Sequence, residues 1–153
     1  MTETNDELHG EALVDIPFYK LYSIRAITLG TFFGGILPGA YMLAQNFKEL
    51  NESRKASVTW LCTAGVVLFV IATLFVPALD KIPSVAFSFL FTVLAGSMAR
   101  KFQRTAIEEH QITGGSLQSP GKILLICVIG IAIMVLLLSG IYAFASLASD
   151  SSN

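Results

Sequence analysis

Apolar and polar residues alternate in long blocks along this chain. Four blocks contain no Asp, Glu, Lys, Arg or His, and they cover residues 26–46, 57–76, 84–99 and 123–148. A helix rises about 1.5 Å per residue, so about 20 residues cross a hydrocarbon core that is about 30 Å thick. The pattern therefore predicts an all-α membrane protein: a bundle of four transmembrane helices with a cytoplasmic helical extension of the third.

This prediction treats the whole chain, residues 1–153, as a single membrane domain. Residues 1–22 are expected to form an acidic tail and an interfacial segment, and residues 100–121 a cytoplasmic helix and loop. The four spans are expected at about 24–46, 57–77, 82–99 and 122–148.

The first and third blocks are weaker candidates for spans than the other two. The first contains four glycines and Pro38, which removes a helical hydrogen bond, and the third has only 16 residues. An arrangement with three spans therefore stays open, in which the first or third block is re-entrant or lies at the membrane surface. Gly34, Gly35 and Pro38 mark the first block as the place where we expect a broken or kinked helix.

Lysine and arginine are unevenly distributed around the four predicted spans. The loop between the first and second spans and the loop between the third and fourth together carry seven of the ten. Positively charged loops tend to stay in the cytoplasm. We therefore predict that loops 47–56 and 100–122 are cytoplasmic and that both termini lie outside.

The composition excludes several classes of function. Hydrophobic residues make up 54% and charged residues 14%, against about 25% charged in an ordinary soluble domain, and the net charge of −1 gives no basic surface for nucleic acid. None of the charge lies inside the four blocks. Its absence there argues against proton-coupled transport, voltage sensing and the four-helix multidrug exporters, which rely on a glutamate in their first span.

Small residues recur at helix-packing intervals in two of the blocks. Small side chains let helices approach closely, and Ser and Thr add hydrogen bonds. We interpret these positions as packing faces within the bundle, with a seam between copies of the chain or the lining of a conduit as alternatives. They are Gly30, Gly34, Gly35 and Gly39 in the first block, and Ser84, Ser88, Thr92 and Gly96 in the third.

Catalytic, cofactor and metal sites find little support, and none is predicted. Both histidines lie outside the four blocks, so a serine within a span has no base beside it. His110 follows Glu108 and Glu109, but this spacing lacks the i,i+4 geometry of a helical metal-ligand pair. We expect these three residues to lie on a solvated helix surface.

The first block and its exit, GTFFGGILPGAYMLAQNFKEL, resemble a set of uncharacterised small multi-pass bacterial membrane proteins. The resemblance implies a location in the bacterial inner membrane and brings no assigned activity, and Pro38 stands where a small residue is expected. His110 followed by Gly114 and Gly115 is similar too. The residues of the first block that carry the resemblance are Gly34, Gly35, Gly39, Tyr41, Leu43, Ala44, Asn46, Phe47 and Lys48.

Two functional hypotheses follow. The first is a non-enzymatic accessory or partner-binding subunit, whose partners are the lipid bilayer and either a second copy of the chain or another membrane protein. The alternative is a small oligomeric channel or uniporter for an ion or neutral solute, using the Ser84, Ser88, Thr92 and Gly96 face and the break in the first block. Neither hypothesis involves nucleic acid.

Overall fold

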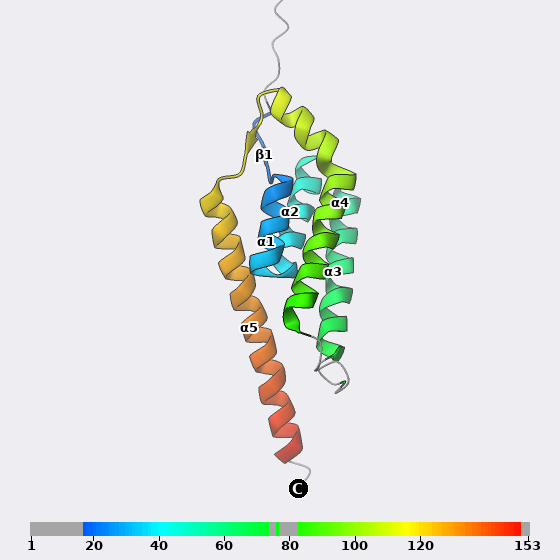
Figure 1. Cartoon of the computed structure of the whole chain (residues 1–153), viewed down its shortest axis with the longest axis vertical. Helices are drawn as coiled ribbons and strands as arrows, with labels where there is room; N and C mark the ends of the chain where they lie inside the picture. Colours follow the sequence, from blue (N-terminus) through cyan, green and yellow to red (C-terminus); the bar gives the residue numbers. More distant parts are fainter. Residues whose placement is uncertain (1–16, 74–75, 77–82, 151–153) are drawn as a thin grey trace, which may run out of the picture.

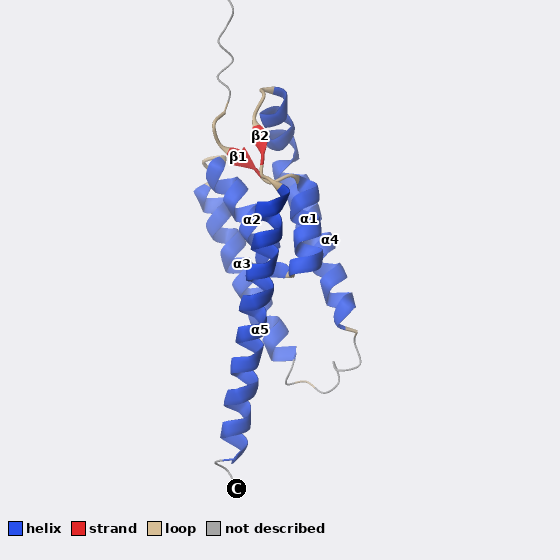
Figure 2. Cartoon of the chain, turned by 90° about the vertical axis from the view of Figure 1, so that its left-hand side faces the viewer, coloured by secondary structure: helices blue, strands red, loops and turns tan. Residues whose placement is uncertain are grey.

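The computed structural model describes residues 17–73, 76 and 83–150, and within them the chain is almost entirely helical (Figures 1 and 2). Two short strands, β1 (Lys20–Leu21) and β2 (Ser116–Leu117), pair in parallel. The helices are α1 (Ile24–Gly34), α2 (Ile36–Glu49), α3 (Ser53–Thr73), α4 (Ser84–Ile112) and α5 (Pro120–Asp150).

The first apolar block forms two helices that fold back on each other. Gly30 of α1 packs against Met42 of α2, and Thr31 packs against Gly39, so the two helices run antiparallel from the turn at Gly35. The single span predicted at 24–46 is therefore wrong. The prediction fails because the turn divides the block into two short helices, and the second helix returns the chain to the end at which the first began.

Three helices, α3, α4 and α5, are long and apolar enough to cross a membrane. This matches the three-span alternative, with the first block as the exception. The third block continues as one helix to Ile112, so the predicted helical extension past residue 99 is present. The fourth block is helical throughout the described residues, from Pro120 to Asp150.

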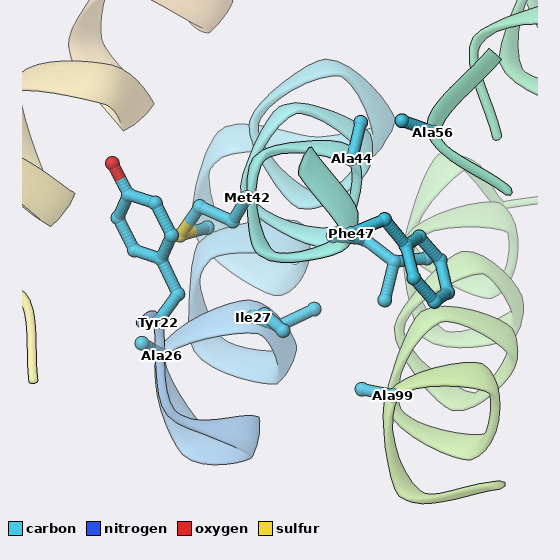
Figure 3. Close-up of a cluster of buried hydrophobic side chains, with 9 residues drawn as sticks. Tyr22, Ala26, Ile27, Met42, Ala44, Phe47, Ala56 and Ala99 are labelled. Atoms are coloured by element: carbon cyan, nitrogen blue, oxygen red, sulfur yellow. The ribbon is translucent and has the colours of Figure 1, made fainter. Parts of the chain in front are cut away.

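The α1–α2 hairpin is the centre of the molecule. α1 contacts α2, α4 and α5, and α2 contacts α3, α4 and α5, whereas the long helices scarcely touch one another within the described residues. The buried core follows this arrangement, because it combines Ile27 and Met42 of the hairpin with Ala56 of α3 and Ala99 of α4 (Figure 3). The hairpin thus holds the long helices in place.

The hairpin also changes where the ends of the chain lie. Residues 17–23, 50–52 and 113–119 gather at one end of the molecule, which we call the loop end, while α5 finishes at the opposite end (Figure 1). The predicted arrangement placed residues 17–23 on the same side as the end of α5, and the structure contradicts it. The predictions for residues 1–16 and for the chain at 77–82 lie outside the described residues.

Candidate functional site

The glycines of the first block are the contact points of the hairpin. A Cβ atom on Gly30 would collide with Met42, and one on Gly39 would collide with Thr31. A Cβ on Gly34 would lie 2.7 Å from Pro38 Cγ and 3.0 Å from Cys127 Cα of α5. Three of the four glycines predicted at packing positions are thus in close contact inside one chain.

Gly35 and Pro38 have separate roles in the turn. Gly35 has φ +82° and ψ −170°, a backbone conformation that residues with a Cβ strongly disfavour. Pro38 lies in the first turn of α2, where its missing N–H leaves no helical hydrogen bond unmade. The break expected at Pro38 is therefore present in the block but lies at Gly35, and buried Pro38 packs against Gly34 and Gly130.

The small-residue face of α4 lies partly against the hairpin. Gly96 is buried, and a Cβ there would lie 3.0 Å from Thr28 Oγ1 of α1. The Thr92 hydroxyl donates a 2.7 Å hydrogen bond to the Ser88 carbonyl of its own helix, and both residues are half-buried. The side chain of Ser84 lies outside the described part of the structure.

A buried polar network joins the segment that precedes α1 to α2 and α4 near the loop end. The Asn46 side chain accepts a hydrogen bond from Tyr22 N at 2.7 Å and donates to Tyr22 O at 2.8 Å. The same amide nitrogen donates to Gln103 Oε1 at 3.0 Å, and Gln103 Nε2 donates to Leu43 O at 2.8 Å. Asn46 and Gln103 are fully buried, so these bonds replace hydration that the two amides lose.

Sequence reasoning missed this network. Asn46 is the last residue of the first charge-free block, and Gln103 is one of several polar residues in the helix predicted after residue 99. A buried amide needs partners wherever it lies. The partners here are 24 and 57 positions away along the chain, so spacing gave no indication of them.

His110 is also buried, which contradicts the expected solvated surface. It is 3% exposed and stacks on Tyr19, with ring centroids 4.8 Å apart. Its Nε2 lies 3.1 Å from Ser116 O, a backbone group that only accepts, so Nε2 carries the proton. Glu108 and Glu109 are exposed as expected, and no group of three metal-ligating side chains occurs within the described residues.

The end of α4 explains why His110 is covered. Gly114 has φ +82°, its N–H bonds to Gln111 O, and Gly115 N–H bonds to His110 O at 2.7 Å, which is a Schellman C-cap. The chain then turns back over the His110 ring, and a Cβ on Gly115 would collide with it. The two glycines therefore end the helix, and the same turn packs against the histidine.

Every Lys and Arg of the described residues lies in the half of the molecule nearest the loop end. They lie in the strand β1, at the first turn of α1, near the end of α2, at the start of α3 and α5, and in the second half of α4. The list is Lys20, Arg25, Lys48, Arg54, Lys55, Arg100, Lys101, Arg104 and Lys122.

Three apolar grooves flank the hairpin within the described residues. One, of about 170 Å³, lies between α2, α3 and α4, and one of about 400 Å³ lies between α1 and α5. The third, of about 460 Å³, lies between α3 and α5 and has α2 as its floor, and we call it the α3–α5 groove. It is lined by Leu37, Pro38, Tyr41, Trp60, Ile126, Ile129, Gly130 and Ile133.

Comparison of the chain with protein-family models, curated proteins and solved structures finds no match. The resemblance drawn from the first block therefore stays a prediction.

Proposed function

We propose that this protein is a non-enzymatic, multi-pass membrane protein that works by binding another membrane protein through the second half of α5. The observation that carries the proposal is the number of large apolar side chains that are exposed between residues 131 and 147. Leu136 is 72% exposed, Tyr142 79% and Phe144 75%, although this helix is the most apolar of the three candidate spans. Figures 1 and 2 show this half of α5 extending beyond the other helices.

The small residues of the chain support the same surface. Gly30, Gly34 and Gly39 of the first block are in close contact within the chain, so they offer no face to a second protein. Gly140 differs, because a Cβ there would meet no atom within 4 Å. Ser139, Gly140 and Ala143 lie together on this half of α5, and small residues at such intervals allow a partner helix to approach closely.

The proposal includes an orientation in the membrane. The loop end carries every described Lys and Arg, and basic segments next to spans are retained in the cytoplasm. The loop end is then cytoplasmic, including residues 17–23, and α5 ends on the opposite side. The hairpin enters the bilayer from the cytoplasmic side, and its shorter helix spans about 16 Å, roughly half of the hydrocarbon core.

Photocrosslinking tests the association surface. A photoreactive phenylalanine at position 136 is compared with one at position 125, where Leu125 is also exposed and lies on the same face of α5 three turns away. We expect a protein adduct of defined mass at position 136, weakened by Gly140→Leu, and only lipid adducts at 125. Lipid adducts alone at both positions would contradict the proposal, and an adduct of twice the chain mass would make the partner a second copy.

The channel alternative has less support than the binding proposal. Gly96 packs against Thr28, so part of the suggested conduit face is covered by α1 of the same chain. Ion flux into vesicles that contain purified protein tests it directly. Flux that is present in the native chain and lost in the Ser88→Leu, Thr92→Leu double variant would restore the channel hypothesis.

A further inference from the structure

The α3–α5 groove is open toward the space that lipid chains occupy. α3 and α5 scarcely touch, so the groove leads from the outer surface of the protein to α2. Its volume of about 460 Å³ falls in the range of sites that hold small molecules, about 300–1,000 Å³. Apolar side chains line it almost completely, with Tyr41 and Trp60 at its sides.

Two lysines lie at the loop end of the groove, on the helix faces that line it. Lys48 is seven residues from Tyr41 and eleven from Leu37, which at 100° per residue places all three within about 40° on α2. Lys122 is four residues from Ile126 and eleven from Ile133, so it shares their face of α5 in the same way.

The two lysines also lie at similar depth. Pro38 of α2 packs against Gly130 of α5, and the two helices run antiparallel. Asn46 on α2 and Lys122 on α5 each lie eight residues from this contact toward the loop end, which is about 12 Å along each helix. Lys48 is two residues past Asn46, so both ammonium groups lie above the same end of the groove.

Neither lysine is neutralised by a neighbour within the described residues. Both side chains are exposed, and neither takes part in an ion pair there. The acidic residues that follow Lys48 in the sequence contact other side chains: Glu49 accepts a 2.8 Å hydrogen bond from Gln45, and Glu52 pairs with Lys55. An apolar slot with two free cations at one end is complementary to a molecule with one apolar tail and an anionic head.

We propose that the α3–α5 groove binds an anionic phospholipid, with an acyl chain against α2 and the phosphate between Lys48 and Lys122. Lysine side chains extend toward the headgroup region while their stems cover apolar surface, and basic pockets between helices recognise acidic headgroups in this way. Each lysine near the membrane surface is worth about a fivefold change in affinity for an acidic lipid. The site adjoins the partner surface on the second half of α5, and the two share Ile133, which lines the groove and is partly exposed.

Trp60 is the only tryptophan in the chain, and it lines the groove, so its fluorescence reports the lipid that occupies the site. The protein is placed in vesicles of mixed phosphatidylcholine and phosphatidylglycerol, with bromine on the acyl chains of one lipid at a time. At equal mole fraction we expect brominated phosphatidylglycerol to quench Trp60 more strongly than brominated phosphatidylcholine. The Lys48→Gln, Lys122→Gln variant should quench equally with both.

A matched variant separates this site from general attraction of acidic lipid. Lys101→Gln, Arg104→Gln removes two exposed charges from α4, and the preference for phosphatidylglycerol should persist in it. Filling the groove by Ile133→Phe should reduce quenching by both lipids. The proposal is overturned if both brominated lipids quench the native chain equally, or if the preference for phosphatidylglycerol survives the loss of Lys48 and Lys122. It is also overturned if the α4 variant loses the preference to the same extent as the Lys48 and Lys122 variant. A Trp60 that neither lipid quenches, because a second copy covers it, would overturn it as well.

Discussion

The side-chain amide of Asn46 binds both polar groups of the Tyr22 backbone, accepting from its N–H at 2.7 Å and donating to its C=O at 2.8 Å. A neighbouring β-strand binds the backbone N–H and C=O of one residue in the same way. It closes the open end of the hairpin, because Tyr22 leads into α1 and Asn46 lies in the last turns of α2. The Gly35 turn closes the other end, so the hairpin is fixed at both ends.

Replacing Asn46 by Ala leaves Tyr22 and Gln103 with buried polar groups that have lost their partners. Each such group costs about 1–3 kcal/mol, so we expect Asn46→Ala to lower the free energy of unfolding by about 3 kcal/mol. Gln45→Ala is the control, since the neighbouring Gln45 is only half-buried and bonds Glu49 at the surface. Denaturation in detergent measures both variants, and a native-like midpoint for Asn46→Ala would show that the network contributes little.

The sequence was sufficient to find α3 and α5, because each contains an uninterrupted charge-free block long enough to cross a bilayer. It was insufficient for the first block. The same apolar residues, with the same hydropathy, can form either one long helix or two helices of half the length. Gly34, Gly35 and Pro38 indicated a break in the helix, but they did not indicate the angle between the helices on either side of it. The direction of the chain after the break depends on Asn46 meeting Tyr22, a contact between residues 24 positions apart.

His110 shows the same limit at the level of one side chain. Exposed Glu108 and Glu109 precede it in the helix, and a local pattern assigns all three to a solvated surface. Its burial comes from Tyr19, which lies beside it only because β1 pairs with β2 in parallel. Pairings of this kind join distant parts of the chain and leave no periodic signal in the sequence.

Gly35 and Gly65 offer a matched test of the turn. Gly35 has φ +82° and ψ −170°, a conformation that costs about 2 kcal/mol for a residue with a Cβ, so Gly35→Ala should destabilise the protein by about that amount. Gly65 lies inside α3 with nothing near its Cβ position, and Gly65→Ala should be neutral or stabilise by about 0.5–1 kcal/mol. Thermal unfolding of the two variants measures the difference, and equal midpoints would argue against the turn.

Tyr22 has a buried hydroxyl group at the loop end of the hairpin. Its hydroxyl has no hydrogen-bond partner within the described residues and points away from the core cluster (Figure 3). Burial raises the pKa of Tyr22 to about 12, from an ordinary value of 10.0, with smaller contributions from Tyr41 and Glu49. The tyrosinate absorbance of the folded protein should therefore include a rise near pH 12, and Tyr22→Phe should remove that rise.

The same shift predicts how Tyr22 affects stability at alkaline pH. The unfolded chain loses this proton near pH 10 and the folded chain near pH 12, so the contribution of Tyr22 is complete below pH 10 and falls as the pH rises toward 12. Tyr22→Phe should flatten this part of the stability profile and should match or exceed native stability at neutral pH, because it removes an unpaired buried hydroxyl. Tyr142→Phe is the control, since Tyr142 is 79% exposed.

The position of the N-terminal end distinguishes the hairpin from a first span. Both arrangements place the end of α5 outside, but a span at 24–46 puts residues 17–23 outside, whereas the hairpin returns them to the basic loop end. We expect a fluorescent protein fused before residue 1 to fluoresce, and alkaline phosphatase fused after residue 153 to be active. A dark N-terminal fusion with an active C-terminal phosphatase would restore four spans. A fluorescent N-terminal fusion with an inactive C-terminal phosphatase would contradict either arrangement, because three crossings cannot return the chain to its starting side and the four-span arrangement places both ends outside.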